Sequence, residues 1–202
     1  VQELCGRGLA AELRLDLLPA KDVTAYVAGR LGEPTTATLA AFIHERDGFY
    51  MATVGENGQP YVQFRGGPKG FLKVLDEQTL GYADFRGNLQ YISVGNLKAN
   101  NKAAIFLMDY PNQSRLKIFA EIEVIDAADD PALIERLTMP DYTAKIERAM
   151  LLHVTAYDWN CPQHITPRFT LEEIEAGTKP LRDRIAELES EVERLQNGSV
   201  SV

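Results

Sequence analysis

Alternating apolar and polar positions dominate the middle of the chain and predict a series of β-strands. The clearest alternation lies in segment 115–125, where apolar residues recur at every second position: Leu116, Ile118, Ala120, Ile122 and Val124. Aromatic and β-branched runs predict further strands at 48–54, 61–65, 71–75, 80–85, 103–108 and 151–159. Turn residues separate several runs, above all Asn57-Gly58, a pair typical of a tight hairpin. The pattern therefore predicts antiparallel hairpins.

Helical spacing of apolar residues predicts three helices around these strands. The first follows a capping Thr36 and runs to about residue 45, the second covers 88–100 with Asn88 as N-cap, and the third covers 129–150. Apart from the final segment, 151–159, about six strands with one short helix inserted favour an antiparallel barrel over a parallel α/β sheet. The predicted fold class is mainly β with flanking helices (α+β), a six-stranded antiparallel split barrel.

The C-terminal segment 171–197 is predicted to form one amphipathic helix. Its apolar residues recur at intervals of four and three, as in a coiled coil: Leu181, Ile185, Leu188, Val192 and Leu195. Two interpretations stay open, contact with a second copy and packing against the chain's own barrel. The predicted organisation is an N-terminal leader at 1–34, a barrel domain at 35–170, this helix, and a disordered tail at 198–202.

Charge is unevenly distributed along the chain. The 202 residues include 29 acidic and 21 basic side chains, for a net charge of −8, which makes a general nucleic-acid binder unexpected. The two cysteines, Cys5 and Cys161, form no CxxC pair, and the three histidines show no metal-ligand spacing, so no metal site is expected. No apolar run has the length of a transmembrane span, so a cytoplasmic protein without membrane contact is predicted.

The basic residues of the middle gather with glycines in two segments that one predicted hairpin separates. The first segment holds Arg65, Gly66, Gly67, Lys69 and Lys73. The second holds Asp84, Phe85, Arg86, Asn88 and Gln90, at the expected start of a helix. Glycines permit close backbone approach, guanidinium groups supply fixed positive charge, and a helix start favours anions. Together the two segments predict a phosphate site, although turns and solvated surface charge would also explain each one alone.

Residues 48–125 resemble the pyridoxamine 5′-phosphate oxidase-like flavoproteins, which have the FMN-binding split-barrel fold, and in particular the predicted flavin-nucleotide-binding branch. Three segments carry the resemblance: Arg65-Gly-Gly-Pro-Lys-Gly-Phe, Asp84-Phe-Arg-Gly-Asn-Leu-Gln-Tyr-Ile-Ser-Val-Gly-Asn-Leu and Arg115-Leu-Lys-Ile-Phe. The resemblance implies FMN as cofactor, held at the interface of a homodimer. The true oxidases carry an Arg-Lys pair where this chain has Leu89-Gln90.

The resemblance also implies roles for individual residues. Arg65 and the segment through Lys73 would line the ribityl-phosphate or ring edge of the flavin, and Arg86, Asn88 and Gln90 would bind its phosphate. Arg115 would place a polar side chain against the ring. The oxidases end in a segment with Trp and Arg or His residues that contacts FMN and substrate, and residues 159–169 loosely resemble it. By this resemblance Trp159 would contact the cofactor, and His164 and Arg168 would contact the substrate. We assign no general base; His164 is the candidate to test.

Three functions are compatible with these residues. The first is an FMN-dependent oxidoreductase acting on a small organic substrate. The second is a non-catalytic flavin- or nucleotide-binding sensor or storage module, and the third is a regulatory or assembly protein whose C-terminal helix recruits a partner. The cofactor would carry the redox chemistry in the first case, and the protein would supply binding, orientation and polarity.

Overall fold

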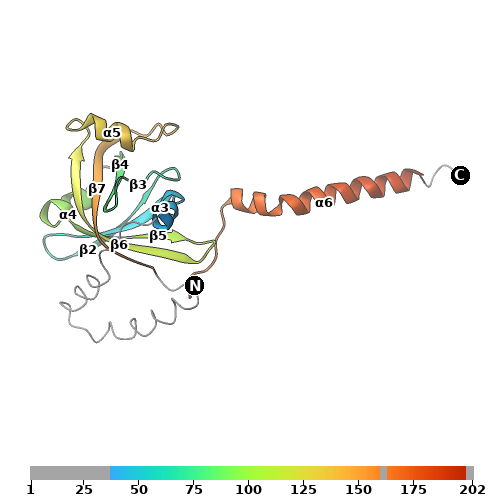
Figure 1. Cartoon of the computed structure of the whole chain (residues 1–202), viewed down its shortest axis with the longest axis horizontal. Coiled ribbons are helices and arrows are strands. Elements are labelled where there is room, and N and C mark those ends of the chain that lie inside the picture. The colour runs from blue at the N-terminus through green and yellow to red at the C-terminus, as the bar shows by residue number, and fades with distance from the viewer. Residues whose placement is uncertain (1–36, 160–162, 199–202) are drawn as a thin grey trace. The chain divides into compact units, whose positions relative to one another are not determined.

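The computed structural model describes residues 37–159 and 163–198 (Figure 1). Two compact units are distinguished, one that contains the sheet and ends at Ile165, and one that contains the C-terminal helix together with Tyr110–Asn112. The predicted leader, the Thr36 cap, Cys5, Cys161 and the predicted tail from residue 199 onward lie outside the described residues.

The first unit is built on one seven-stranded antiparallel sheet, which confirms the predicted fold class and includes one very short strand. Its strands are β1 (Gly48–Val54), β2 (Pro60–Gly66), β3 (Lys73–Val74), β4 (Thr79–Phe85), β5 (Lys102–Asp109), β6 (Ser114–Asp126) and β7 (Ile146–Trp159). They pair in the order β2-β1-β5-β6-β7-β4-β3. The β1–β2 hairpin turns at Asn57-Gly58 as predicted, with Gly58 at φ 79° and the Asn57 side chain accepting from Gln59 N–H.

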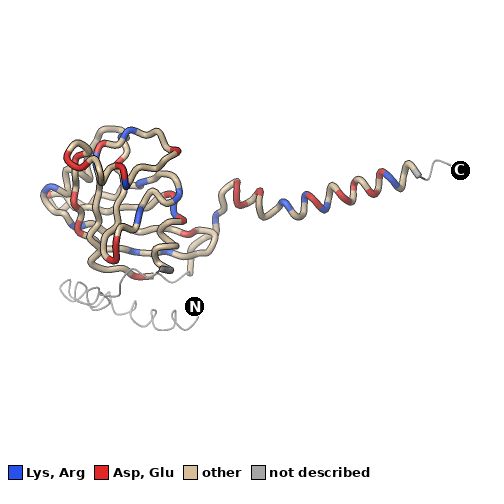
Figure 2. The backbone as a smooth tube through the Cα atoms, turned by 45° about the horizontal axis from the view of Figure 1, so that its top comes forward, with Lys and Arg blue, Asp and Glu red and all other residues tan. Residues whose placement is uncertain are grey.

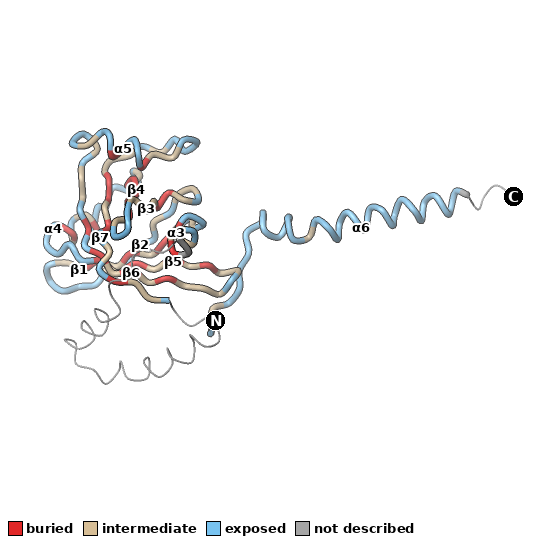
Figure 3. Tube along the Cα trace, viewed as in Figure 1, coloured by how far each residue is buried: buried red, intermediate tan, exposed pale blue. Residues whose placement is uncertain are grey.

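Alternation along the strands places one set of side chains inside the barrel. Met51, Ile105, Leu107, Leu116 and Ile118 are at most 1 % exposed and form its centre, and Figure 3 shows the resulting alternation of buried and intermediate positions. Phe49, Phe71 and Tyr82 pack together at one side of this core. Burial of large apolar side chains at about 1.5–3 kcal/mol each is the main stabilising contribution.

Strand β2, at one end of the sheet order, meets β4, the neighbour of the strand at the other end, through side chains. Strand β2 forms backbone pairs with β1 alone, and its inward-facing Arg65 makes an ion pair with Asp84 on β4, Nη1 to Oδ1 2.7 Å. Close by, the Gln63 side chain of β2 accepts a 2.7 Å hydrogen bond from Ser93. We call this side-chain junction of β2 with β4 and residue 93 the seam.

Three short helices flank the sheet: α3 (Ala37–His44), α4 (Ile92–Ala99) and α5 (Pro131–Leu137). The α4 helix buries Ser93 and Leu97, and Asn96 donates to the Thr53 hydroxyl of β1 at 3.0 Å. The N-cap of the α5 helix is Asp130, whose carboxylate accepts from Leu133 N–H, and the helix covers Ala83 and Ala149 with Leu133 and Leu137.

Two helix predictions are wrong in extent. The helix predicted at 129–150 ends at Leu137, and residues from Ile146 onward form strand β7. Ala149 and Met150 are fully buried between β4 and β6, so the tertiary environment overrides a helix-prone local sequence. The helix predicted from Asn88 begins at Ile92, because the Asn88 side chain closes a turn by accepting from Gln90 N–H instead of capping.

The second unit contains α6 (Leu171–Gly198), which matches the predicted helix. Its start is fixed by a capping box, in which Glu173 N–H donates to the Thr170 hydroxyl and Thr170 N–H donates to the Glu173 carboxylate at 2.8 Å. Both acidic and basic residues occur along its length (Figure 2).

Candidate functional site

A buried carboxylate between two arginines lies at the seam. Asp84 is 3 % exposed, and its two oxygens accept from different guanidinium groups, Oδ1 from Arg65 at 2.7 Å and Oδ2 from Arg148 at 2.8 Å. Asp84 and Arg148 are paired across β4 and β7. Ion pairs of this length between mostly buried side chains are strong and directional, so they fix both arginines.

A second carboxylate extends this group toward the protein surface. Glu147 contacts Arg148 at 3.1 Å and accepts a 3.1 Å hydrogen bond from the Tyr91 hydroxyl. Its other cationic neighbour is Arg86, with Nε 3.6 Å from Oε1 and a side chain 46 % exposed. Arg86 is therefore the least constrained arginine of the group. The three arginines and two carboxylates together carry a net charge of +1.

The loop between β4 and α4 has an unusual backbone. Leu89 and Tyr91 have φ values of 64° and 50°, in the left-handed region that residues with a side chain rarely adopt. Tyr91 is also the N-cap of α4, and no side chain caps the helix there. Strained residues gather at ligand-binding loops, and an uncapped helix start presents N–H groups with a partial positive charge. The loop can accept an anion.

The predicted residues of three segments line one narrow cleft at this loop. Arg65 comes from β2, Asp84 and Phe85 from β4, and Asn88 and Gln90 from the loop. The space is about 60 Å³, far below the roughly 300–1,000 Å³ of a pocket for a whole organic ligand. It suits a group of phosphate size.

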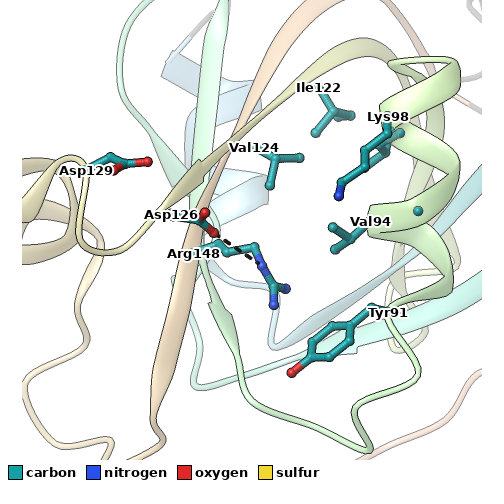
Figure 4. Close-up of a pocket in the computed structure, with 10 residues that line it drawn as sticks. Tyr91, Val94, Lys98, Ile122, Val124, Asp126, Asp129 and Arg148 are labelled. Atoms are coloured by element: carbon teal, nitrogen blue, oxygen red, sulfur yellow. Dashed lines mark ion pairs between the residues drawn. The ribbon is translucent and has the colours of Figure 1, made fainter.

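A second, wider cleft of about 530 Å³ lies on the other side of Tyr91, between α4 and strands β6 and β7 (Figure 4). Val94, Ile122 and Val124 form its apolar wall, and Lys98 and Arg148 extend toward it. Arg148 lines this wide cleft and stacks on Tyr91, with its guanidinium carbon 4.6 Å from the ring centre. Because Asp84 bonds to both Arg148 and Arg65, it links the wide cleft to the narrow one.

Two predicted cofactor ligands make other contacts. The Lys73 ammonium donates to the carbonyls of Arg136 and Thr138 at 2.6 and 3.0 Å, where it holds the end of α5, and burial lowers its pKa. Trp159 packs edge-on against Phe42 with ring centres 4.7 Å apart. Neither residue lines the narrow cleft in this chain.

The remaining predicted cofactor residues are spread over the barrel. Lys69 is exposed, Gly66 lies beneath the Phe64 ring, and Gly67 lies against Phe71. Arg115 lies on β6, with its guanidinium carbon 5.9 Å from the Phe106 ring centre and a buried Nε without a hydrogen-bond partner among the described residues.

The predicted substrate residues are not among the residues that line the narrow cleft. His164 is exposed, with φ 65°, and Arg168 belongs to the second unit, where its guanidinium lies 5.0 Å from the Tyr110 ring centre. Their assignment to substrate, and His164 as a general base, stay predictions.

Sequence reasoning missed several residues of the site, namely Tyr61, Gln63, Tyr91, Glu147 and Arg148. The last two stood inside the helix predicted at 129–150. An Arg-bearing strand opposite Asp84 could have been found only by recognising β7 as the neighbour of β4.

Tyr82, two residues before Asp84, has a buried hydroxyl with no hydrogen-bond partner among the described residues. Its ring lies 5.3 Å from that of Phe49. Burial raises the pKa of Tyr82 well above its usual range, because an anion there would lose its hydration. Tyr82 therefore stays neutral at physiological pH.

None of the helices in the described ranges is long and apolar enough to cross a membrane. A search of curated proteins finds no match to this chain.

Comparison with solved structures finds similar chains, and the HupZ match supports the fold. A HupZ variant from Group A Streptococcus matches with a TM-score of 0.50 at 16 % identity, covering 62 % of this chain and 98 % of that one. A putative pyridoxamine 5′-phosphate oxidase from Lactobacillus delbrueckii has a TM-score of 0.47 at 22 % identity, with 62 % and 93 % covered. An FMN-binding protein from Syntrophomonas wolfei has a TM-score of 0.47 at 12 % identity, with 76 % and 97 % covered.

The family assignment comes from the sequence itself. The model of the pyridoxamine 5′-phosphate oxidase family matches residues 35–161, a range that includes every strand and both clefts. Since this range is more than half of the chain, the protein belongs to the pyridoxamine 5′-phosphate oxidase family, a flavin-binding family of oxidoreductase type.

Proposed function

We propose that this chain binds FMN through the narrow cleft beside α4 and acts as an FMN-dependent oxidoreductase on a small organic substrate. The observation that supports this most directly is the convergence of Arg65, Asn88 and Gln90, from separate segments, on one phosphate-sized space. The uncapped start of α4 and the left-handed Leu89 and Tyr91 add backbone donors to the same loop.

The charges around the cleft fit a phosphate. Arg65, Arg148 and Arg86 outnumber Asp84 and Glu147 by one charge. A third carboxylate, Asp126, lies 3.9 Å from Arg148, but it is 73 % exposed and lines the wide cleft instead. Arg86 does not itself line the cleft but contacts Glu147, which does. We assign Arg86 to the phosphate because its guanidinium is half-exposed and its contact with Glu147, at 3.6 Å, is longer than a hydrogen bond. In this assignment Arg86 compensates for Leu89-Gln90, which replace the Arg-Lys pair of the oxidases.

A cleft of about 60 Å³ holds a phosphate and leaves the flavin ring outside it. We therefore propose a homodimer in which a second copy covers the ring. The outer face of edge strand β2 supports this, because Val62 and Phe64 are 59 % and 57 % exposed. Phe64 and Tyr50 pack edge-to-face, and Tyr50 stacks on Phe106, so these rings form a continuous apolar surface.

When bound, the flavin supplies the redox chemistry. The arginines and loop N–H groups of this chain bind and orient its phosphate, and the buried Asp84 pair keeps two of the arginines in place. The buried Tyr82 stays neutral and so adds no negative charge near these arginines.

FMN titration of three single variants tests the site. Arg86→Ala and Asn88→Ala should each weaken FMN binding by about tenfold or more, since each removes a polar contact to a charged group. Arg136→Ala is the matched control, because this exposed α5 arginine uses its carbonyl, and not its side chain, to bind Lys73. Wild-type protein that takes up no FMN would contradict cofactor binding, and equal affinity in all variants would contradict the site.

Turnover separates the enzyme from a sensor or storage module. Purified protein loaded with oxidised FMN is mixed with pyridoxine 5′-phosphate without oxygen, where oxidation of the alcohol to the aldehyde would reduce the flavin by two electrons, and oxygen is then admitted to reoxidise the flavin. Reoxidation that forms product repeatedly supports the oxidoreductase. Bound flavin that shows no turnover with a panel of small organic substrates would favour the non-catalytic alternative.

The dimer is tested by Phe64→Glu, which places a charge on the exposed β2 surface. We expect a monomer in sedimentation velocity together with weaker FMN binding. Glu123→Lys, an exposed change on β6, is the control. A Phe64→Glu chain that keeps the wild-type sedimentation coefficient would show that this surface is not the interface.

A further inference from the structure

The C-terminal helix carries a longer heptad pattern than its five most obvious apolar residues. Taking Leu181 as position d places Thr178, Ile185 and Val192 at a, and Leu181, Leu188 and Leu195 at d. Ile174 falls at the preceding d position. In Figure 3 the helix is coloured exposed over almost its whole length, and the apolar side chains from Leu181 to Leu195 are 43–66 % exposed.

The residue types at a and d distinguish between kinds of coiled coil. Every a position from residue 178 to 192 is β-branched and every d position from 181 to 195 is leucine. β-Branched residues at a with leucine at d favour two parallel strands over trimers and tetramers. The pattern therefore selects a parallel dimer.

The flanking charges agree with a parallel, in-register pairing. In such a dimer a g residue faces the e residue five positions later in the partner helix. Arg184 is at g and Glu189 is at e, so two copies form two opposite-charge pairs. Glu191 at g faces the neutral Gln196, and Gly177 at g faces Arg182, so no like-charge pair arises.

We propose that α6 pairs with α6 of a second copy as a parallel, in-register two-stranded coiled coil over residues 178–195. Pro180 falls at position c of this arrangement, on the outer side of the pair. The Thr178 hydroxyl is satisfied by the Ile174 carbonyl at 2.7 Å, so this polar residue can occupy a position at the helix interface.

About two and a half heptads form a marginal coiled coil when helices meet only by diffusion. The barrel dimer, which is part of the proposed function, would tether two copies of α6 and raise their effective concentration to the millimolar range. This step alone rests on the proposed function; the choice of a parallel pair rests on the a, d, e and g residues.

Disulfide trapping in the full chain tests the geometry. Leu181→Cys and Leu195→Cys are made separately in a chain with Cys5→Ser and Cys161→Ser, and Ser190→Cys, at the outer f position, is the control. In a parallel, in-register pair each d-position cysteine meets its own copy, so both variants should cross-link about a hundredfold faster than the control. In an antiparallel pair centred on Leu188, residue 181 of one copy would face residue 195 of the other. Such a pair would cross-link only when the Leu181→Cys and Leu195→Cys chains are mixed.

A charge exchange tests the same register independently. Arg184→Glu should slow cross-linking at Leu195→Cys by severalfold, because it places a carboxylate at position 184 opposite the Glu189 carboxylate of the second copy. Adding Glu189→Arg should restore the rate. Since the double change also alters the intrahelical Arg184–Glu187 pair, recovery identifies the interhelical contact.

Three results overturn the coiled coil: d-position cysteines that cross-link no faster than Ser190→Cys, cross-linking only in the mixture, or a charge exchange without effect. FMN absorbance and sedimentation are recorded on the same samples. A yellow dimer without cross-linking refutes the coiled coil and leaves the flavin proposal intact. A colourless chain that cross-links rapidly refutes the flavin proposal and leaves the coiled coil intact.

Discussion

Removing the carboxylate of Asp84 should destabilise the barrel more than any other single polar change at the seam. The variant Asp84→Asn keeps the size of the side chain and removes its charge. Asp84 accepts two charge-assisted hydrogen bonds, at 2.7 and 2.8 Å, from guanidinium groups that are themselves only 16 % and 13 % exposed. Each such bond contributes about 1.5–3 kcal/mol, so losing both predicts about 3–6 kcal/mol.

A second estimate gives a similar figure. Removing one partner of a buried ion pair costs about 3–5 kcal/mol, because an uncompensated charge stays behind. Arg65 already has a buried Nε without a partner among the described residues, so it has little alternative bonding. We therefore expect the free energy of unfolding to fall by about 4 kcal/mol, within the range both estimates share.

Urea unfolding followed by far-ultraviolet circular dichroism measures this change. With a slope of about 2 kcal/mol per molar, the midpoint should fall by about 2 M. The control Glu123→Gln removes a surface carboxylate that is 55 % exposed beside His153, and it should change stability by less than about 1 kcal/mol. An Asp84→Asn chain that loses less than the control would refute the view that this ion pair closes the barrel.

Three further changes test single contacts. Lys73→Met removes two charged hydrogen bonds to the carbonyls at the end of α5. Urea unfolding should therefore show a loss of about 1–3 kcal/mol in the free energy of unfolding, and titration should show unchanged FMN affinity. Weaker FMN binding at unchanged stability would instead assign Lys73 to the cofactor. Tyr82→Phe removes a buried, unpartnered hydroxyl and should raise stability by about 1 kcal/mol. Because burial raises the pKa of Tyr82, the unfolded chain loses this proton as pH rises above about 10 while the folded chain keeps it. The free energy of unfolding of the wild type should therefore fall at alkaline pH more than that of the variant; identical pH profiles would contradict this. Gly95→Ala, in α4, adds a Cβ that meets nothing within 4 Å and should raise the thermal midpoint through about 0.5–1 kcal/mol of helix propensity; a lower midpoint would show that the wide cleft is more crowded than described.

Strand alternation made most of the barrel predictable. Segment 115–125 has one apolar face, and it forms the buried side of β6 with the predicted register of inward positions. The Asn57-Gly58 turn was equally predictable, because few other residue pairs adopt its backbone geometry.

The parts that could not be predicted depend on contacts between distant segments. Residues 146–150 contain good helix formers, and only burial between two neighbouring strands makes them a strand. With that strand, Glu147 and Arg148 were lost from the predicted site. In the same way, the sequence could show that Lys73 is basic and close to glycines, but not that the carbonyls at the end of α5 occupy its ammonium group.

The seam also has a consequence for motion. Strand β2 exchanges backbone hydrogen bonds with β1 alone, so one long edge of the barrel is held by the Arg65–Asp84 pair and the Ser93–Gln63 hydrogen bond. Such an edge can separate without breaking a backbone ladder. Once it has separated, β2 is held by its pairing with β1 alone, so this pairing should open locally and the amide hydrogens of β2 should exchange with solvent well before those of the central strands β5 and β6. Bound ligand that bridges Arg65 and the α4 loop would slow this opening, which makes hydrogen exchange at β2 a direct measure of occupancy.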